Sequence, residues 1–160
     1  GMCKLRTRTD GAQERNMRAG TENIYGIVGL TKAMEIAHRD MESHEKHIKG
    51  LKLYMAEELK KALPNIEFNG DPLGESLYTV LNVHFPHSDM DEMLIYNIDI
   101  EGICVSGGSA CSSGSSVGSH VLSGLGINQE QPSLRFSFSK YNTKEEIDYT
   151  INVIKELFGQ

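Results

Sequence analysis

Residues 21–64 read TENIYGIVGLTKAMEIAHRDMESHEKHIKGLKLYMAEELKKALP, with apolar or small side chains recurring every three or four positions. These positions are Ile27, Leu30, Met34, Ala37, Met41, Ile48, Leu51, Met55 and Leu59. Such spacing places one apolar stripe along an α-helix. The pattern predicts one long amphipathic helix, or a kinked pair, over 22–62. Pro64 marks its end.

Two later stretches alternate apolar with polar residues, as a half-buried β-strand does. The apolar positions are Leu81, Val83 and Phe85 in the first stretch and Leu134, Phe136 and Phe138 in the second. Asn82 and Arg135 fall on the polar face of these strands. Residues 66–68 and 103–105 are predicted to be shorter strands.

The remaining elements set the fold class. Ser88 is the expected N-cap of a short helix that reaches Ile98, and Thr143 with Glu146 forms a predicted capping box for the last helix. Short strands with helices between them predict an α+β fold, a small, mostly antiparallel sheet with helices packed on one face. The polar face is expected to lie against another domain or subunit.

The composition excludes several classes of protein. The chain has 160 residues, 39% of them hydrophobic, and no apolar run near the roughly 20 residues of a membrane span. A net charge of −6 argues against nucleic-acid binding. Residues 1–20 carry +3, which marks a basic irregular segment before a domain over 21–160. Without an apolar leader, the cytoplasm is the expected location.

The segment 106–123 carries the candidate chemistry. It holds eight serines and four glycines among 18 residues, a composition that favours turns and mobility. Cys111 lies in its midst, and an accessible thiol can act as a nucleophile. Cys104 stands between Ile103 and Val105 and is predicted to be a buried core residue.

The residue types present are compatible with a cysteine protease, because His84, His87 and His120 could each serve as the base for the thiol. A nucleophile on a flexible segment argues against it. A phosphate-binding P-loop is excluded, since no Lys occurs between Lys61 and Lys140. The cysteines do not show metal-ligand spacing, so no metal site is assigned.

Three motifs in order resemble the pyridoxal-phosphate cysteine desulfurases of the class V aminotransferase family. They are the SGGSACSSGS run at 106–115, the stretch from Gln13 to Asn23 before the long helix, and SLRFS at 133–137. The resemblance is to the NifS/IscS-like branch with a long mobile loop, and it extends over essentially the whole chain. It implies the small C-terminal domain of a fold-type I enzyme, with residues 1–20 in a cofactor-proximal loop.

The resemblance also implies roles for three residues. Cys111 would take the sulfur of L-cysteine as a persulfide, leave L-alanine, and pass the sulfur to an iron–sulfur scaffold or another acceptor protein. The same thiol is a possible ligand of cluster iron. Arg135 would bind the substrate carboxylate. Thr21 would reach the pyridoxal 5'-phosphate of the other subunit of a homodimer.

The family's cofactor-binding Lys, in a Ser-x-His-Lys pattern, has no match in this sequence. We therefore expect a fragment that is inactive alone, with that motif shortly before Met2 in the parent enzyme. Two alternatives remain open. One is a selenocysteine lyase or other class V aminotransferase enzyme in which Cys111 is dispensable. The other is a stand-alone sulfur-carrier or interaction module.

Overall fold

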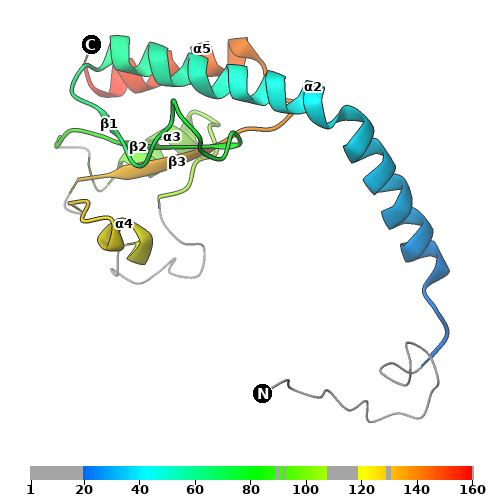
Figure 1. The fold of residues 1–160 in the computed structure, drawn as a ribbon. Helices are drawn as coiled ribbons and strands as arrows, with labels where there is room; N and C mark the ends of the chain where they lie inside the picture. The colour runs from blue at the N-terminus through cyan, green and yellow to red at the C-terminus, as the bar shows by residue number, and fades with distance from the viewer. Residues whose placement is uncertain (1–19, 89–90, 92, 108–118, 129–130, 160) are drawn as a thin grey trace. The chain divides into compact units, whose positions relative to one another are not determined.

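A computed structural model describes residues 20–88, 91, 93–107, 119–128 and 131–159 of the chain. The elements in order are α2 (Ile24–Ala62), β1 (Glu67–Phe68), β2 (Val80–His84), α3 (Leu94–Ile100), α4 (His120–Gly124), β3 (Ser133–Ser137) and α5 (Lys144–Leu157) (Figure 1). The chain divides into two compact units, Gly1–Met41 and Glu42–Gln160. The boundary between the two units falls inside α2.

The second unit contains a three-stranded antiparallel sheet in the order β1-β2-β3. Successive strand residues point to opposite faces. Leu81 and Val83 of β2 and Leu134 and Phe136 of β3 are therefore buried on one face, each no more than 5% exposed. The α+β fold with a small antiparallel sheet is confirmed, as is the polar alternation that places Arg135 on the opposite face.

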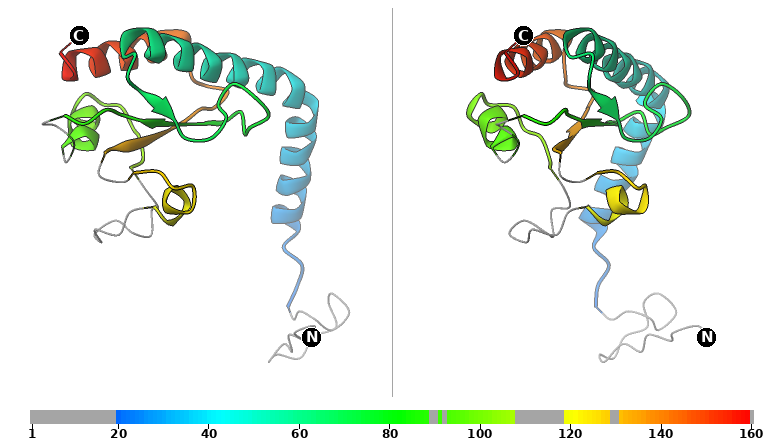
Figure 2. Two further views of the ribbon diagram at one scale, coloured as in Figure 1. Left: turned by 60° about the vertical axis from the view of Figure 1, so that its left-hand side comes forward. Right: turned by 90° about the vertical axis from the view of Figure 1, so that its left-hand side faces the viewer.

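Two helices cover the apolar face of the sheet. The second half of α2 and all of α5 lie side by side over it (Figures 1 and 2). The core they form with the sheet includes Leu51, Met55, Leu59, Leu81, Val83, Phe85, Leu134, Phe136, Ile147, Ile151 and Ile154. Helix α3 adds Leu94 and Ile98 to the same core.

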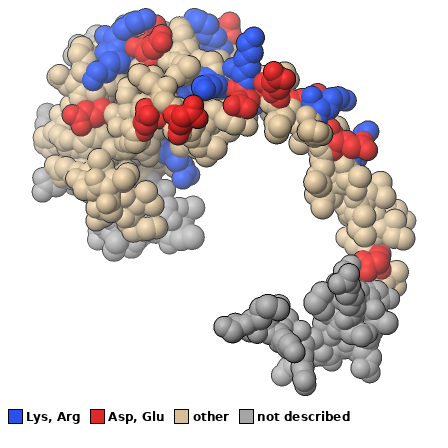
Figure 3. Space-filling model, viewed as in Figure 1, with Lys and Arg blue, Asp and Glu red and all other residues tan. Residues whose placement is uncertain are grey.

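The predicted apolar stripe of α2 is buried only in part. From Ile48 onward its residues are buried, but Ile27, Leu30, Met34 and Met41 are each more than half exposed within the described residues. Figure 3 shows the surface of the first turns of α2 as mostly uncharged. None of the described helices is long and apolar enough to cross a membrane.

Helix α5 begins as the sequence predicts. The Thr143 side chain accepts the backbone N–H of Glu146, and the Glu146 carboxylate accepts the backbone N–H of Thr143 at 3.1 Å. This capping box satisfies N–H groups that have no partner inside the helix. It fixes the start of a helix that supplies three core residues.

Two predicted elements differ from the structure. Helix α3 begins at Leu94 rather than beside Ser88, and the N–H and hydroxyl of Ser88 instead donate to Asp91 Oδ1. Residues 103–105 are not a strand. Pairing with the outer edge of β3 is confined, among the described residues, to one bridge between Ser106 and Arg135.

The capping box provides a stability test. Thr143→Ala removes the side-chain acceptor for Glu146 N–H, so we expect the free energy of unfolding to fall by about 1 kcal/mol. Urea denaturation measures the change. Thr143→Ser keeps the acceptor and serves as the matched control. An unchanged midpoint in Thr143→Ala would show that water replaces the cap without cost.

Candidate functional site

Arg135 lies on the face of the sheet that the core does not use. Its neighbours Leu134 and Phe136 are buried, so the strand alternation turns its exposed side chain the other way. Its cross-strand partner is Asn82 of β2. Within the described part of the chain, the guanidinium forms no ion pair or hydrogen bond. It is therefore free to bind an external anion.

The backbone of Arg135 also holds the start of the Ser/Gly segment. Arg135 N–H donates to Ser106 O at 2.7 Å, and Ser106 N–H donates to Arg135 O at 3.1 Å. Two backbone hydrogen bonds thus join Ser106, five residues before Cys111, to Arg135. Cys111 itself lies outside the described residues.

A pocket of about 320 Å³ lies beside Arg135 at the open edge of β2. The edge is open because β1 ends at Phe68, and the backbone N–H of Asn69 makes a last bond to Asn82 O at 3.0 Å before the chain turns away. The polar side chains lining the pocket include Lys52, Asn69, Asp71, Asn82 and Arg135.

Lys52 brings a second positive charge to this pocket. The residue is 3% exposed, and its ammonium donates to Ser76 Oγ at 2.8 Å and Leu77 O at 3.0 Å. Burial lowers the pKa of Lys52, and the nearby Asp71 carboxylate only partly opposes that shift. The pocket thus contains a buried cation whose hydrogen-bond partners are neutral.

A chain of hydrogen bonds crosses the polar face of the sheet. Asn69 Nδ2 donates to Asn82 Oδ1 at 2.7 Å and to Ser133 Oγ at 3.1 Å. Ser133 Oγ also contacts His84 Nδ1 at 2.9 Å, and His84 Nε2 contacts Gln131 Oε1 at 2.8 Å. These hydrogen bonds hold polar side chains of β2 and β3, the residue after β1 and the approach to β3 in one arrangement.

The three histidines considered as protease bases differ in their surroundings. Both ring nitrogens of His84 are engaged, so it has no free nitrogen to act as a base. His87 is exposed and pairs through Nδ1 with Asp91 Oδ2 at 2.5 Å. His120 is exposed in the first turn of α4. The structure therefore marks none of these three histidines as the base for a thiol.

Cys104 is exposed, so the prediction of a buried core residue is wrong. Its neighbours Ile103 and Val105 are half-buried against the core. The side chain of Cys104 is therefore turned outward, whereas those of its two neighbours pack against the core. Apolar neighbours in the sequence do not bury a residue that lies between them on the other face.

Thr21 stands exposed just before α2, in the first unit. It is not the helix cap, because Asn23 Oδ1 accepts Gly26 N–H at 3.1 Å. The Thr21 hydroxyl makes no hydrogen bond with any described residue. The structure does not relate Thr21 to Arg135.

The Ser/Gly segment is not irregular throughout. Ser119 Oγ accepts Leu122 N–H at 3.4 Å and caps the five-residue helix α4. Helix α4 overlaps the stretch 106–123 that the composition marked as a loop, and it ends one residue beyond that stretch. Serine favours turns, but its hydroxyl also starts helices, so composition alone missed this element.

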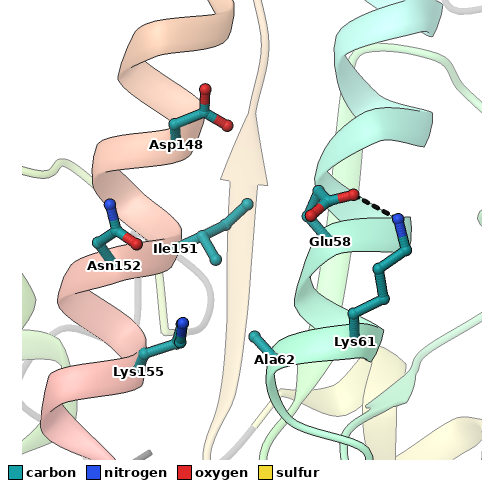
Figure 4. Close-up of a pocket in the computed structure, with 7 residues that line it drawn as sticks. All are labelled: Glu58, Lys61, Ala62, Asp148, Ile151, Asn152 and Lys155. Atoms are coloured by element: carbon teal, nitrogen blue, oxygen red, sulfur yellow. Dashed lines mark hydrogen bonds and ion pairs between the residues drawn. The ribbon is translucent and has the colours of Figure 1, made fainter.

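A separate pocket of about 350 Å³ lies between α2 and α5 (Figure 4). Ala62 and Ile151 line it together with charged side chains, and Glu58 pairs with Lys61 at 2.5 Å. It contains no thiol. The described residues hold no cluster of three or more side chains suited to a metal ion. The Arg135 pocket has no cysteine in its lining either, but it contains the predicted residue Arg135, whose guanidinium has no partner among the described residues, and it is therefore the better candidate site.

Sequence reasoning identified Arg135 but missed Lys52 and Asn69. Lys52 falls at a stripe position of α2, four residues after Ile48, and a lysine placed there signals a charge held at the core. Asn69 carried no comparable signal, since its role depends on where β1 leaves the sheet.

Comparison with known proteins shows the class of protein to which this chain belongs. The aminotransferase class-V family model matches residues 3–150. The chain belongs to this family. A cysteine desulfurase IscS of Dictyoglomus turgidum is 38% identical over 149 residues, and one of Methanosarcina thermophila is 40% identical over 149 residues. Each alignment covers 92% of this chain.

Solved structures agree with the family. A NifS-like protein from Rickettsia africae has a TM-score of 0.73 at 28% identity, covering 94% of this chain and 39% of its own. Another NifS-like protein has a TM-score of 0.72 at 31% identity, covering 96% of this chain and 39% of its own. The chain spans 36–37% of the length of the two desulfurase relatives.

The buried Lys52 gives a pH-dependent prediction. Its pKa is lowered in the folded chain and stays near 10.4 in the unfolded chain, so between these values the unfolded chain binds more protons. The Lys52 contribution to the free energy of unfolding therefore rises with pH in this window. Lys52→Met should remove that rise, measured by urea denaturation from about pH 7 to 10.5.

Lys46→Met is the matched control, because Lys46 is an exposed lysine on the same helix. Its stability should depend on pH as the wild type's does. Equal slopes for Lys52→Met and the wild type would contradict a lowered pKa at Lys52.

Proposed function

We propose that this chain is part of a pyridoxal-phosphate-dependent cysteine desulfurase that moves the sulfur of L-cysteine onto Cys111. The observation that carries the proposal is the backbone bridge between Ser106 and Arg135. Five residues of chain span at most about 17 Å. A cysteine five residues beyond this bridge is therefore within reach of the residue proposed to bind the substrate.

Arg135 is proposed to bind the substrate carboxylate. A guanidinium presents a planar pair of donors that matches both carboxylate oxygens, and hydrogen bonds of this kind are stronger than neutral ones. The side chain is exposed and has no partner among the described residues. Its position on a strand, rather than on a loop, gives the carboxylate a rigid anchor.

Cys111 is proposed to be the sulfur acceptor. Pyridoxal phosphate, which the family implies, supplies the electron sink for carbon–sulfur cleavage when it is bound. The Cys111 thiolate attacks the sulfur of the substrate, and a sulfur–sulfur bond forms as the carbon–sulfur bond breaks. The carbon takes the electron pair and then a proton. The products are L-alanine and a persulfide on Cys111.

The described residues fit the cofactor at one point. A free hydroxyl at Thr21, beside the N-terminus of the 39-residue helix α2, suits a phosphate oxygen. We assign Thr21 to the cofactor phosphate of the partner in a homodimer.

The delivery of sulfur is proposed to end on an iron–sulfur scaffold or another acceptor protein. The relatives named IscS support this context. A persulfide must leave the site where it forms, so Cys111 would be carried from Arg135 to an acceptor by the segment between Ser106 and Ser119. A reducing compartment such as the cytoplasm suits a reactive thiol.

The first test concerns Cys111. In the full-length holoenzyme, Cys111→Ala should lower the release of L-alanine from L-cysteine by at least about 100-fold, because the nucleophile is removed. Assays of alanine and sulfide under a reducing agent measure this. Cys104→Ala, at the exposed thiol outside the mechanism, should stay within about twofold of wild type. Full activity of Cys111→Ala would instead indicate a selenocysteine lyase or a related enzyme that does not need the thiol.

The second test concerns Arg135. Arg135→Lys keeps the charge but loses the bidentate geometry, so KM for L-cysteine should rise about tenfold or more. Steady-state kinetics of the holoenzyme measure the change. Lys140→Arg, an exposed cation beyond the end of β3, should leave KM unchanged. A normal KM in Arg135→Lys would remove Arg135 from carboxylate binding.

A further inference from the structure

We infer that Asn82 is a second carboxylate-binding residue, donating from Nδ2 to the substrate beside the Arg135 guanidinium. The inference rests on the proposed function, because it names a further contact for the same substrate. Asn82 and Arg135 face each other as partners on β2 and β3. Side chains at such positions start about 5 Å apart on one face of the sheet. Both line the 320 Å³ pocket.

The hydrogen bonds of Asn82 leave its donors unused. Asn69 Nδ2 donates to Asn82 Oδ1 at 2.7 Å, which occupies the acceptor end of the amide. No described residue accepts from Asn82 Nδ2. The side chain is half-buried, and polar groups in such places normally find a partner. A group that only accepts hydrogen bonds, such as a carboxylate, would meet both Asn82 and Arg135.

The amide of Asn82 is also held in place. Asn69, which binds its oxygen, donates to Ser133 Oγ as well, and Ser133 is in contact with His84. Asn69 is therefore a positioning residue: it orients the Asn82 donors without touching the substrate. A fixed neutral donor beside the guanidinium restricts the orientation of a bound carboxylate further.

The charges around the pocket favour an anion. Lys52 and Arg135 line it, against one carboxylate at Asp71. Asp71 Oδ1 already accepts the backbone N–H of Gly74 at 2.9 Å. The pocket therefore offers the Arg135 guanidinium and the amide donors of Asn82 to a ligand, and the buried Lys52 adds positive charge beside them, while the single carboxylate is engaged in its own loop.

The test is a comparison of KM and kcat in the full-length holoenzyme with L-cysteine. Asn82→Ala should raise KM about tenfold, the loss expected for one hydrogen bond to a charged group, with kcat changed less than about threefold. Asn82→Asp keeps the size and the acceptor for Asn69 but places a carboxylate against the substrate. Its KM should rise further than that of Asn82→Ala.

Two further variants separate binding from structure. Asn69→Ala should raise KM about threefold, since the Asn82 donors persist but lose their orientation. Ser137→Ala, an exposed residue on the same face two positions after Arg135, should leave KM within about twofold. The cofactor absorbance and circular dichroism of each variant check folding, and Asn82→Asp decides the matter if Asn82→Ala does not fold.

Inhibition by small amines measures binding at this site without requiring the variant to convert L-cysteine. L-Alanine carries the carboxylate and ethylamine lacks it. Asn82→Ala should weaken inhibition by L-alanine about tenfold and leave inhibition by ethylamine unchanged.

The outcomes are distinguishable. A raised KM in both Arg135→Lys and Asn82→Ala supports the inference. A raised KM in Arg135→Lys with normal values in Asn82→Ala and Asn82→Asp overturns it and leaves the proposed function standing. If the wild-type holoenzyme releases no alanine from L-cysteine, the proposed function and the inference both fail.

Discussion

The antiparallel pairing of β2 with β3 positions the core and the candidate site at once. Leu81 and Val83 face Phe136 and Leu134 across this pair, and burying these side chains under α2 and α5 fixes the register. The same register forces Asn82 and Arg135 together on the opposite face. A shift of one residue would bury Arg135 and expose the core, so the site is held by the hydrophobic effect acting on its neighbours.

The polar face is organised by a different kind of interaction. The hydrogen bonds from Asn69 through Ser133 to His84 keep polar side chains satisfied where the sheet would otherwise leave them without partners. On this ordered face, the Arg135 guanidinium has no partner among the residues that the structure describes, and the Arg135 backbone is hydrogen-bonded to Ser106. The arrangement suits a rigid anchor for a small anionic ligand in the pocket beside Arg135.

Much of the fold could be predicted because it depends on local sequence patterns. The strand alternation around Arg135 and the capping box at Thr143 depend on residues within a few positions of each other, and both were confirmed. Ser88 and Cys104 were misjudged for the opposite reason. A cap depends on where a helix can start, and burial depends on which way the backbone turns, so neither follows from the adjacent residues.

The sequence by itself determined the long helix, the apolar faces of the strands, and Arg135 as the side chain opposite the core, because periodicity follows from backbone geometry. The motif around Cys111 could also be recognised from the sequence alone, although that residue lies outside the described part of the chain. Only the tertiary structure brought Lys52, Asn69 and Asn82 to the Arg135 pocket. Residues on a helix, a strand end and a neighbouring strand meet there because the sheet edge opens where β1 stops, and no local pattern encodes that meeting.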